Sequence, residues 1–237
     1  MKRFTAFLLL LSIVLTTYAG DTLRVACVGN SITYGHGIPN REQYSYPAVL
    51  GRLLGSSYEV RNFGISARTL LMKGDRPYMN EPIYREALDY QPDIVTIKLG
   101  TNDTKPFNWQ YGDEFKDDLR TLINSFQALD SHPRIYLCTP IPGGRPDWGI
   151  NDSTLVAAVI PYIREVAAEY DLPVIDLHTA FAPYQHLLYD RVHPNADGAA
   201  VIAHVLAEAI RDGQQPLARK PHGKAWRKSH KAKRPRR

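Results

Sequence analysis

The chain has 237 residues, of which 44% are hydrophobic and 22% charged, so it can bury the core of one ordinary domain. This composition excludes an intrinsically disordered chain, and two cysteines are too few for a disulfide-rich scaffold. The formal charge of +5 comes from the C-terminus, because residues 219–237 contain ten Lys or Arg and no acid. The remainder, with 19 basic and 24 acidic residues, is mildly acidic.

The first residues have the three-part pattern of a secretory signal peptide. Two basic residues, Lys2 and Arg3, precede an apolar stretch over residues 7–15 and a small residue at Ala19. The apolar stretch is well short of the roughly 20 residues that a membrane-spanning helix needs. We therefore expect a signal peptide at residues 1–19, cleavage after Ala19, a secreted or periplasmic protein and no transmembrane segment after cleavage.

Five short apolar runs, bounded mostly by Gly, Pro or Asn, predict β-strands at residues 23–28, 58–62, 93–99, 134–138 and 173–177. Helices are predicted between and after these strands, at residues 46–54, 82–88, 115–129, 152–170 and 195–211. Asp152 or Ser153 is the expected N-cap of the fourth helix. Pro161 is expected to kink or split this helix.

The alternation of strands and helices predicts an α/β fold with a parallel sheet covered on both faces. We expect a doubly wound three-layer sandwich with the flavodoxin-like strand order 2-1-3-4-5. The predicted domain spans residues 20–213, and the polar, basic segment 214–237 is predicted to be a disordered tail. In this strand order Cys27 and Cys138 lie roughly 9–10 Å apart, so two buried thiols are expected and no disulfide.

Three polar signals follow the first three predicted strands, at the edge where doubly wound sheets bind ligands. Ser31 follows the first strand, Gly64 the second and Asn102 the third, and neighbouring strands lie roughly 4.8 Å apart. Serine is a potential nucleophile, glycine lets the backbone approach a ligand, and an asparagine amide can donate to an oxyanion. Each residue alone is also typical of a helix cap or a turn, so only their convergence indicates a site.

A fourth signal, Asp190-Arg191-Val192-His193, supplies a candidate base. The ordinary histidine pKa of about 6.5 suits proton transfer near neutral pH, and a carboxylate three residues earlier can hold the ring in one tautomer. His193 follows the fifth strand, roughly 14 Å from the first strand by strand spacing. Residues 178–192 must therefore curl back over the sheet. A catalytic His193 predicts a rising limb of the pH–rate profile near or above its reference pKa.

These four blocks, in this order and over nearly the whole predicted domain, resemble the SGNH (GDSL-type) hydrolase family. The resemblance implies a serine carboxylic-ester hydrolase with Ser31 as nucleophile, His193 as general base and Asp190 as third triad member. It also implies an oxyanion hole formed by the backbone amides of Ser31 and Gly64 and the side chain of Asn102.

Two positions differ from the pattern of the family. Asn30 stands where the family usually has Asp, and Ala67 stands where related sequences often have Gly. Within the family, residues 32–35 and 101–105, with Asn108-Trp109, resemble secreted carbohydrate O-acetylesterases of the sialate O-acetylesterase type. This resemblance implies removal of O-acetyl groups from a carbohydrate, with sialic acid as the leading substrate.

Candidate substrate-binding residues are Arg68, Lys105 and Trp109, to which Arg145 and Trp148 can be added, because such side chains suit a sugar or a carboxylate. An acetylated glycan or a small ester is therefore the expected partner. We expect no metal and no organic cofactor, because no His or Cys cluster has metal-ligand spacing and no phosphate-binding loop is present.

Several alternatives stay open from the sequence alone. The same chemistry could act on acetylxylan or another plant glycan, or on a lysophospholipid or thioester. A hypothesis of a different class is a binding module, in which the basic tail holds an anionic polymer. Nucleic acid is not expected as its partner, because the chain is expected to be exported. The sequence does not indicate an oligomeric state.

Overall fold

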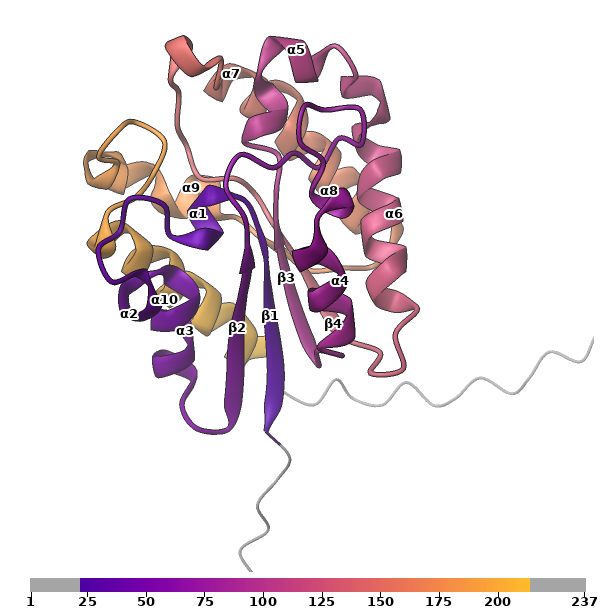
Figure 1. Cartoon of the computed structure of the whole chain (residues 1–237), viewed down its shortest axis with the longest axis vertical. Coiled ribbons are helices and arrows are strands. Elements are labelled where there is room, and N and C mark those ends of the chain that lie inside the picture. Colours follow the sequence, from indigo (N-terminus) through magenta and orange to yellow (C-terminus); the bar gives the residue numbers. More distant parts are fainter. Residues whose placement is uncertain (1–21, 214–237) are drawn as a thin grey trace, which may run out of the picture.

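The structure, a computed structural model, describes residues 22–213. The predicted signal peptide and basic tail lie outside these residues. Five parallel strands form one sheet in the order β2-β1-β3-β4-β5, and helices cover both of its faces (Figure 1). The predicted α/β three-layer sandwich with strand order 2-1-3-4-5 is confirmed.

The strands are β1 (Leu23–Gly29), β2 (Tyr58–Gly64), β3 (Ile94–Lys98), β4 (Arg134–Cys138) and β5 (Val174–Ile175). The longer helices are α3 (Tyr46–Leu54), α4 (Pro82–Asp89), α6 (Phe115–Gln127), α8 (Ile160–Glu169) and α10 (Ala196–Gly213). Short helices that the sequence did not predict are α1 (Ser31–Tyr34), α2 (Arg41–Tyr44), α5 (Pro106–Trp109) and α9 (Leu177–Phe181).

Side chains that alternate along the strands build two cores, one on each face of the sheet. On β1, Val25 and Cys27 pack into the core that contains α3 and α10, whereas Ala26 and Val28 pack into the core of α4, α6 and α8. Every residue of the central strand β3 is buried, as expected for a parallel strand covered on both faces. Cys27 and Cys138 are buried free thiols, as predicted.

The fourth predicted helix differs from the prediction at its start. Its N-cap is Asn151, not Asp152 or Ser153. The side chain of Asn151 accepts a hydrogen bond of 3.3 Å from the N–H of Thr154. A short helix α7 (Asp152–Thr154) and a π-helical turn, η5 (Leu155–Val159), precede α8. Pro161 at the start of α8 has no N–H to donate to the preceding turn, which accounts for the wider turn and the predicted split.

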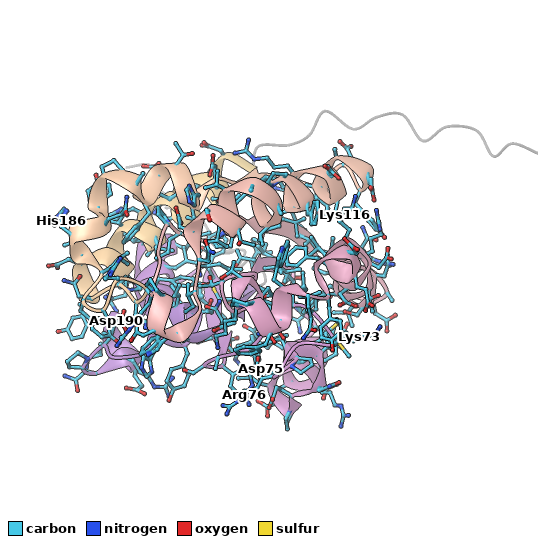
Figure 2. All side chains as sticks on the ribbon, turned by 90° about the horizontal axis from the view of Figure 1, so that it is seen from above. Lys73, Asp75, Arg76, Lys116, His186 and Asp190 are labelled. Carbon is cyan, nitrogen blue, oxygen red and sulfur yellow. The ribbon has the colours of Figure 1, made fainter. Side chains whose placement is uncertain are left out.

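All five strands run in the same direction, so their carboxyl ends meet at one edge of the sheet. The short helices α1 and α5 follow β1 and β3 at this edge, the upper edge in Figure 1. Figure 2 looks onto it from above and labels Asp190, one of the predicted site residues. Within residues 22–213, no helix is both long enough and apolar enough to cross a membrane.

Candidate active site

Ser31 is the first residue of α1 and is separated from the end of β1 by Asn30 alone. The side chain of Asn30 caps this helix, because its Oδ1 accepts the N–H of Ile32 at 3.1 Å. Asparagine therefore supplies a capping oxygen here without a charge. The preceding turn requires Gly29, since a Cβ at that position would lie 2.1 Å from the Oγ1 of Thr33. This close packing fixes the point at which the strand delivers the serine.

His193 and Asp190 lie on a tight loop whose conformation is fixed by its own hydrogen bonds. The N–H of Tyr189 donates to the carbonyl of His193 at 3.1 Å, and Arg191 has a left-handed backbone with φ of 70°. Oδ1 of Asp190 accepts the N–H groups of Val192 at 3.0 Å and of His193 at 2.7 Å. The three-residue spacing therefore places a fixed carboxylate beside the imidazole.

The three predicted triad side chains form one continuous hydrogen-bonded chain. Oδ2 of Asp190 lies 2.7 Å from Nδ1 of His193, and Nε2 of the same ring lies 2.8 Å from Oγ of Ser31. The return over the sheet is made by α9 and by η6 (Ala182–Leu187), which follow β5 and lead to the histidine loop. This is the geometry by which an imidazole can take the proton of a serine hydroxyl.

Burial and local charge set the protonation of this pair. Burial lowers the pKa of His193, and His36 and Lys98 lower it further, whereas Asp190 opposes the shift; the net pKa lies below the ordinary value. Burial raises the pKa of Asp190, but hydrogen bonds from His193 and Val192 outweigh it and hold the pKa below its usual range. At neutral pH a neutral imidazole therefore lies beside a carboxylate, as a general base requires.

Gly64 does not fit the expected role of oxyanion donor. Its N–H donates to Oδ1 of Asn62 at 2.9 Å, and a Cβ on Gly64 would lie 2.3 Å from the backbone nitrogen of Tyr34. Glycine is therefore needed there for close packing. Ser66 and Ala67 of this loop line the cavity beside Ser31, and Ala67 has a left-handed backbone with φ of 67°. Within residues 22–213, neither the N–H of Ala67 nor that of Ser31 donates to a protein acceptor.

Asn102 lies at the start of η2 (Asn102–Thr104) and lines the same cavity. Its Nδ2 group donates one hydrogen bond to the carbonyl of Arg68 at 3.0 Å, and a primary amide has a second N–H to offer. The neighbouring Asp103 is fully buried and accepts two backbone N–H groups of the loop after β2, at 2.8 and 2.9 Å. These two side chains together fix the loop that presents Ala67.

A cavity of about 250 Å³ opens beside Ser31. Its further walls are His36, Ser66, Lys105, Trp148 and Ile150. In the part of the chain that the structure describes, no group of three or more His, Cys, Asp or Glu side chains could hold a metal ion.

Of the three predicted substrate-binding residues, only Lys105 lines this cavity. Arg68 instead forms an ion pair with Glu81 at 2.7 Å. The ring of Trp109 packs against Phe115 and Tyr162, with centroid distances of 6.0 and 6.2 Å. The side chains of Arg68 and Trp109 are thus engaged within the protein, although both residues are close in sequence to site residues.

Of the aromatic side chains beside the base, Trp148 was among the added candidates, whereas His36 is missing from the residues predicted for the site. The ring centroid of His36 lies 4.7 Å from that of His193, and the ring of Trp148 lies 5.9 Å from it. His36 stands between Gly35 and Gly37, whose φ values of 87° and 76° curl the segment after α1. This pair of glycines is the sequence signal that could have drawn attention to the residue between them.

The sequence profile of the GDSL-like lipase/acylhydrolase family matches residues 27–201. The chain belongs to this family. The resemblance inferred from the four blocks is thereby confirmed. The sequence predicted a carboxylic-ester hydrolase. This class agrees with the family and with both curated relatives, which are named esterases.

These relatives are longer than the chain described here. An acetylxylan esterase from Xylanibacter ruminicola is 47% identical over 209 residues, covering 81% of this GDSL-family chain and 44% of that protein. A multidomain esterase from Ruminococcus flavefaciens is 29% identical over 112 residues, covering 46% of this chain and 14% of that protein. The chain thus spans less than half the length of either relative.

Solved structures of esterases share the fold. The carbohydrate acetylesterase Est24 from Sinorhizobium meliloti has a TM-score of 0.66 at 19% identity, and the match covers 80% of this GDSL-family chain and 99% of that one. The native aryl esterase of M. smegmatis has a TM-score of 0.64 at 19% identity, with the same coverage.

Proposed function

We propose that this chain is an exported serine O-acetylesterase that removes acetyl groups from xylan. The observation that carries the substrate is the 47% identity to an acetylxylan esterase over 81% of the chain. This similarity favours xylan over sialic acid, the substrate first inferred from the sequence. The mechanism is supported by the hydrogen-bonded arrangement of Ser31, His193 and Asp190, and export is supported by the leader-like pattern of residues 1–19.

The proposed reaction begins with proton transfer from Ser31 to Nε2 of His193. Oγ of Ser31 attacks the acetyl carbonyl, and the resulting imidazolium is stabilised by the carboxylate of Asp190. The imidazolium then gives its proton to the sugar oxygen as the bond from this oxygen to the acetyl carbon breaks, so the sugar leaves with a free hydroxyl and an acetyl-enzyme remains. His193 next activates a water molecule, which releases acetate and restores the serine.

Three donors are proposed to hold the oxyanion of each tetrahedral intermediate. They are the N–H groups of Ser31 and Ala67 and the second N–H of the Asn102 amide. Both backbone groups belong to residues that line the cavity, and neither has an acceptor within residues 22–213. Donors fixed in this way stabilise developing charge without reorganising during the reaction.

The size of the cavity favours a small acyl group over a fatty one. Its volume of about 250 Å³ is below the roughly 300–1,000 Å³ typical of pockets that enclose drug-sized ligands. Lys105 and Ser66 add polar groups to its walls. A lysophospholipid or a long-chain thioester therefore fits this site less well than an acetylated sugar does.

The decisive experiment measures acetate released from acetylated xylan and, separately, from O-acetylated sialic acid. The wild-type chain is compared with Ser31→Ala and with Ser125→Ala, whose serine lies on α6 and donates to a helix carbonyl. We expect release from xylan by wild type and Ser125→Ala, and a loss of several orders of magnitude in Ser31→Ala. Release from sialic acid alone would overturn the xylan assignment, and an active Ser31→Ala would overturn the mechanism.

A further inference from the structure

Exposed aromatic side chains lie in the wall of the cavity beside Ser31 or next to residues that line it. Within the described residues, Phe107 is 53% exposed, Trp148 39% and Tyr189 51%. Single exposed aromatics are common, but several gathered at one place indicate a binding surface. Their position beside the candidate active site indicates what this surface serves.

The three rings come from segments that are far apart in the sequence. The rings of Trp148 and Tyr189 have centroids 5.9 and 6.0 Å from that of His193. The ring of Phe107, on α5, has its centroid 5.8 Å from Nζ of Lys105, a residue that lines the cavity. A series of close neighbours therefore connects the three rings across the site, through Lys105 on one side and His193 on the other.

Trp148 is held in place before any ligand arrives. The guanidinium of Arg145 lies 3.7 Å from the centre of its ring and also pairs with Asp147 at 3.1 Å. Arg145 and Ile150 exchange two backbone hydrogen bonds, of 2.9 and 3.1 Å, and Gly149 closes the turn with φ of 72°. A ring fixed in this way loses little conformational entropy when a ligand packs on it.

We propose that Phe107, Trp148 and Tyr189 form an aromatic platform that holds a xylan chain across the cavity mouth. The C–H groups of a pyranose ring present an apolar face that packs on aromatic rings, and the Tyr189 hydroxyl and the Lys105 amine can bond sugar hydroxyls. The acetyl group enters the cavity at Ser31 while neighbouring sugars rest on the aromatic platform. This inference rests on the proposed function, because it takes an acetylated glycan as substrate.

The first test measures binding of unacetylated xylo-oligosaccharides of one to six sugars to the full chain carrying Ser31→Ala, by calorimetry. Affinity is expected to rise with length up to at least three sugars. Adding Phe107→Ala is expected to weaken binding of the longer oligosaccharides by about fivefold, the size of one aromatic contact, with less effect on the monosaccharide. Affinity that does not depend on length, or that Phe107→Ala does not change, would overturn the proposal.

The second test compares kcat/KM for acetylated xylan with kcat/KM for p-nitrophenyl acetate. The ratio is expected to fall in Phe107→Ala and in Tyr189→Ala, and to keep its wild-type value in the control Tyr44→Ala, an exposed tyrosine on α2. An unchanged ratio in both platform variants would overturn the platform and leave the proposed function intact. Hydrolysis of p-nitrophenyl acetate without acetate release from any acetylated glycan would instead overturn the proposed function.

Discussion

The carboxylate of Asp190 binds His193 at two places. Its Oδ1 accepts the backbone N–H of His193 at 2.7 Å, while its Oδ2 lies 2.7 Å from Nδ1 of the ring. One side chain therefore fixes both the loop and the orientation of the imidazole. In an Asp190→Asn variant, the amide oxygen could still accept the backbone N–H of His193, but the amide N–H would face Nδ1 of the ring.

Asp190→Asn is therefore expected to lower activity without unfolding the loop. With a donor facing Nδ1, the ring must carry its proton on Nε2, where it cannot accept the proton of Ser31. We expect kcat for p-nitrophenyl acetate to fall by about three to four orders of magnitude, with a circular dichroism spectrum like that of wild type. The control is Asp89→Asn, an exposed position on α4. Near-normal kcat in Asp190→Asn would show that the carboxylate does not set the tautomer.

The pH–rate profile should report the lowered pKa of His193. A general base must be neutral, so kcat/KM rises as the imidazolium loses its proton, and the midpoint equals the pKa in the free enzyme. Burial, assisted by His36 and Lys98, places this pKa below its ordinary value. We therefore expect the midpoint below about pH 6.5, which corrects the sequence-based expectation of a limb near or above that value.

His36→Gln should move this limb in a defined direction. His36, whose ring lies 4.7 Å from that of His193, lowers the pKa of His193. Its removal should raise the pKa of His193 and shift the midpoint of kcat/KM to higher pH. The control is His204→Gln, an exposed position on α10. A shift to lower pH, or an equal shift in the control, would contradict this coupling.

The fold could be predicted from the sequence because its signals are local. Each strand is a short apolar run with a clear end. The strand β3 is buried at every position, so its own residues are enough to predict it. The hydrogen-bonded arrangement of Ser31, His193 and Asp190 was predictable for a different reason, since the order of the four blocks indicates these residues. The backbone bonds to Asp190 fix the turn around His193. The return over the sheet is made by α9 and η6, and the sequence predicted only that such a return was needed.

The rest of the site depends on side-chain packing that sequence spacing does not encode. Gly64 and Ala67 are three residues apart, and the cavity faces Ala67 because β2 runs on through Gly64. Trp109 follows a site segment in the sequence, yet the four-residue helix α5 turns it towards Phe115, whereas Trp148 lines the cavity. Such differences arise from turns of a few residues, whose direction is decided by tertiary contacts.

The left-handed backbone of Ala67 provides a test of stability. At φ of 67° a Cβ is strained, and glycine adopts this conformation more easily. Ala67→Gly is expected to raise the free energy of unfolding by about 1 kcal/mol, measured by urea denaturation. Ala209→Gly on α10 should act in the opposite direction by about 1 kcal/mol, because glycine weakens a helix interior. A loss of stability in Ala67→Gly would show that the alanine side chain packs favourably there.

Lys98 is a basic side chain buried in the interior of the protein. It ends β3 with 1% exposure, and within residues 22–213 its Nζ has no hydrogen-bond acceptor. Burial lowers its pKa to about 7 and outweighs the opposing effect of Cys138. In the unfolded chain the amine keeps its proton up to about pH 10.4, so between these values the unfolded state binds more protons. The free energy of unfolding should therefore rise with pH across this window. Below pH 7 Lys98 is charged in the folded state as well, so the full destabilisation from burying its charge is present there.

Lys98→Met removes this cost while keeping the length of the side chain. We expect it to raise the free energy of unfolding at pH 6 by on the order of a few kcal/mol, with a gain that shrinks towards pH 10. Urea denaturation at both pH values measures the difference. Lys116→Met, at a surface ion pair with Glu165, should change stability by less than about 1 kcal/mol at either pH. A Lys98→Met variant that loses stability at pH 6 would mean that the folded protein stabilises the charged amine.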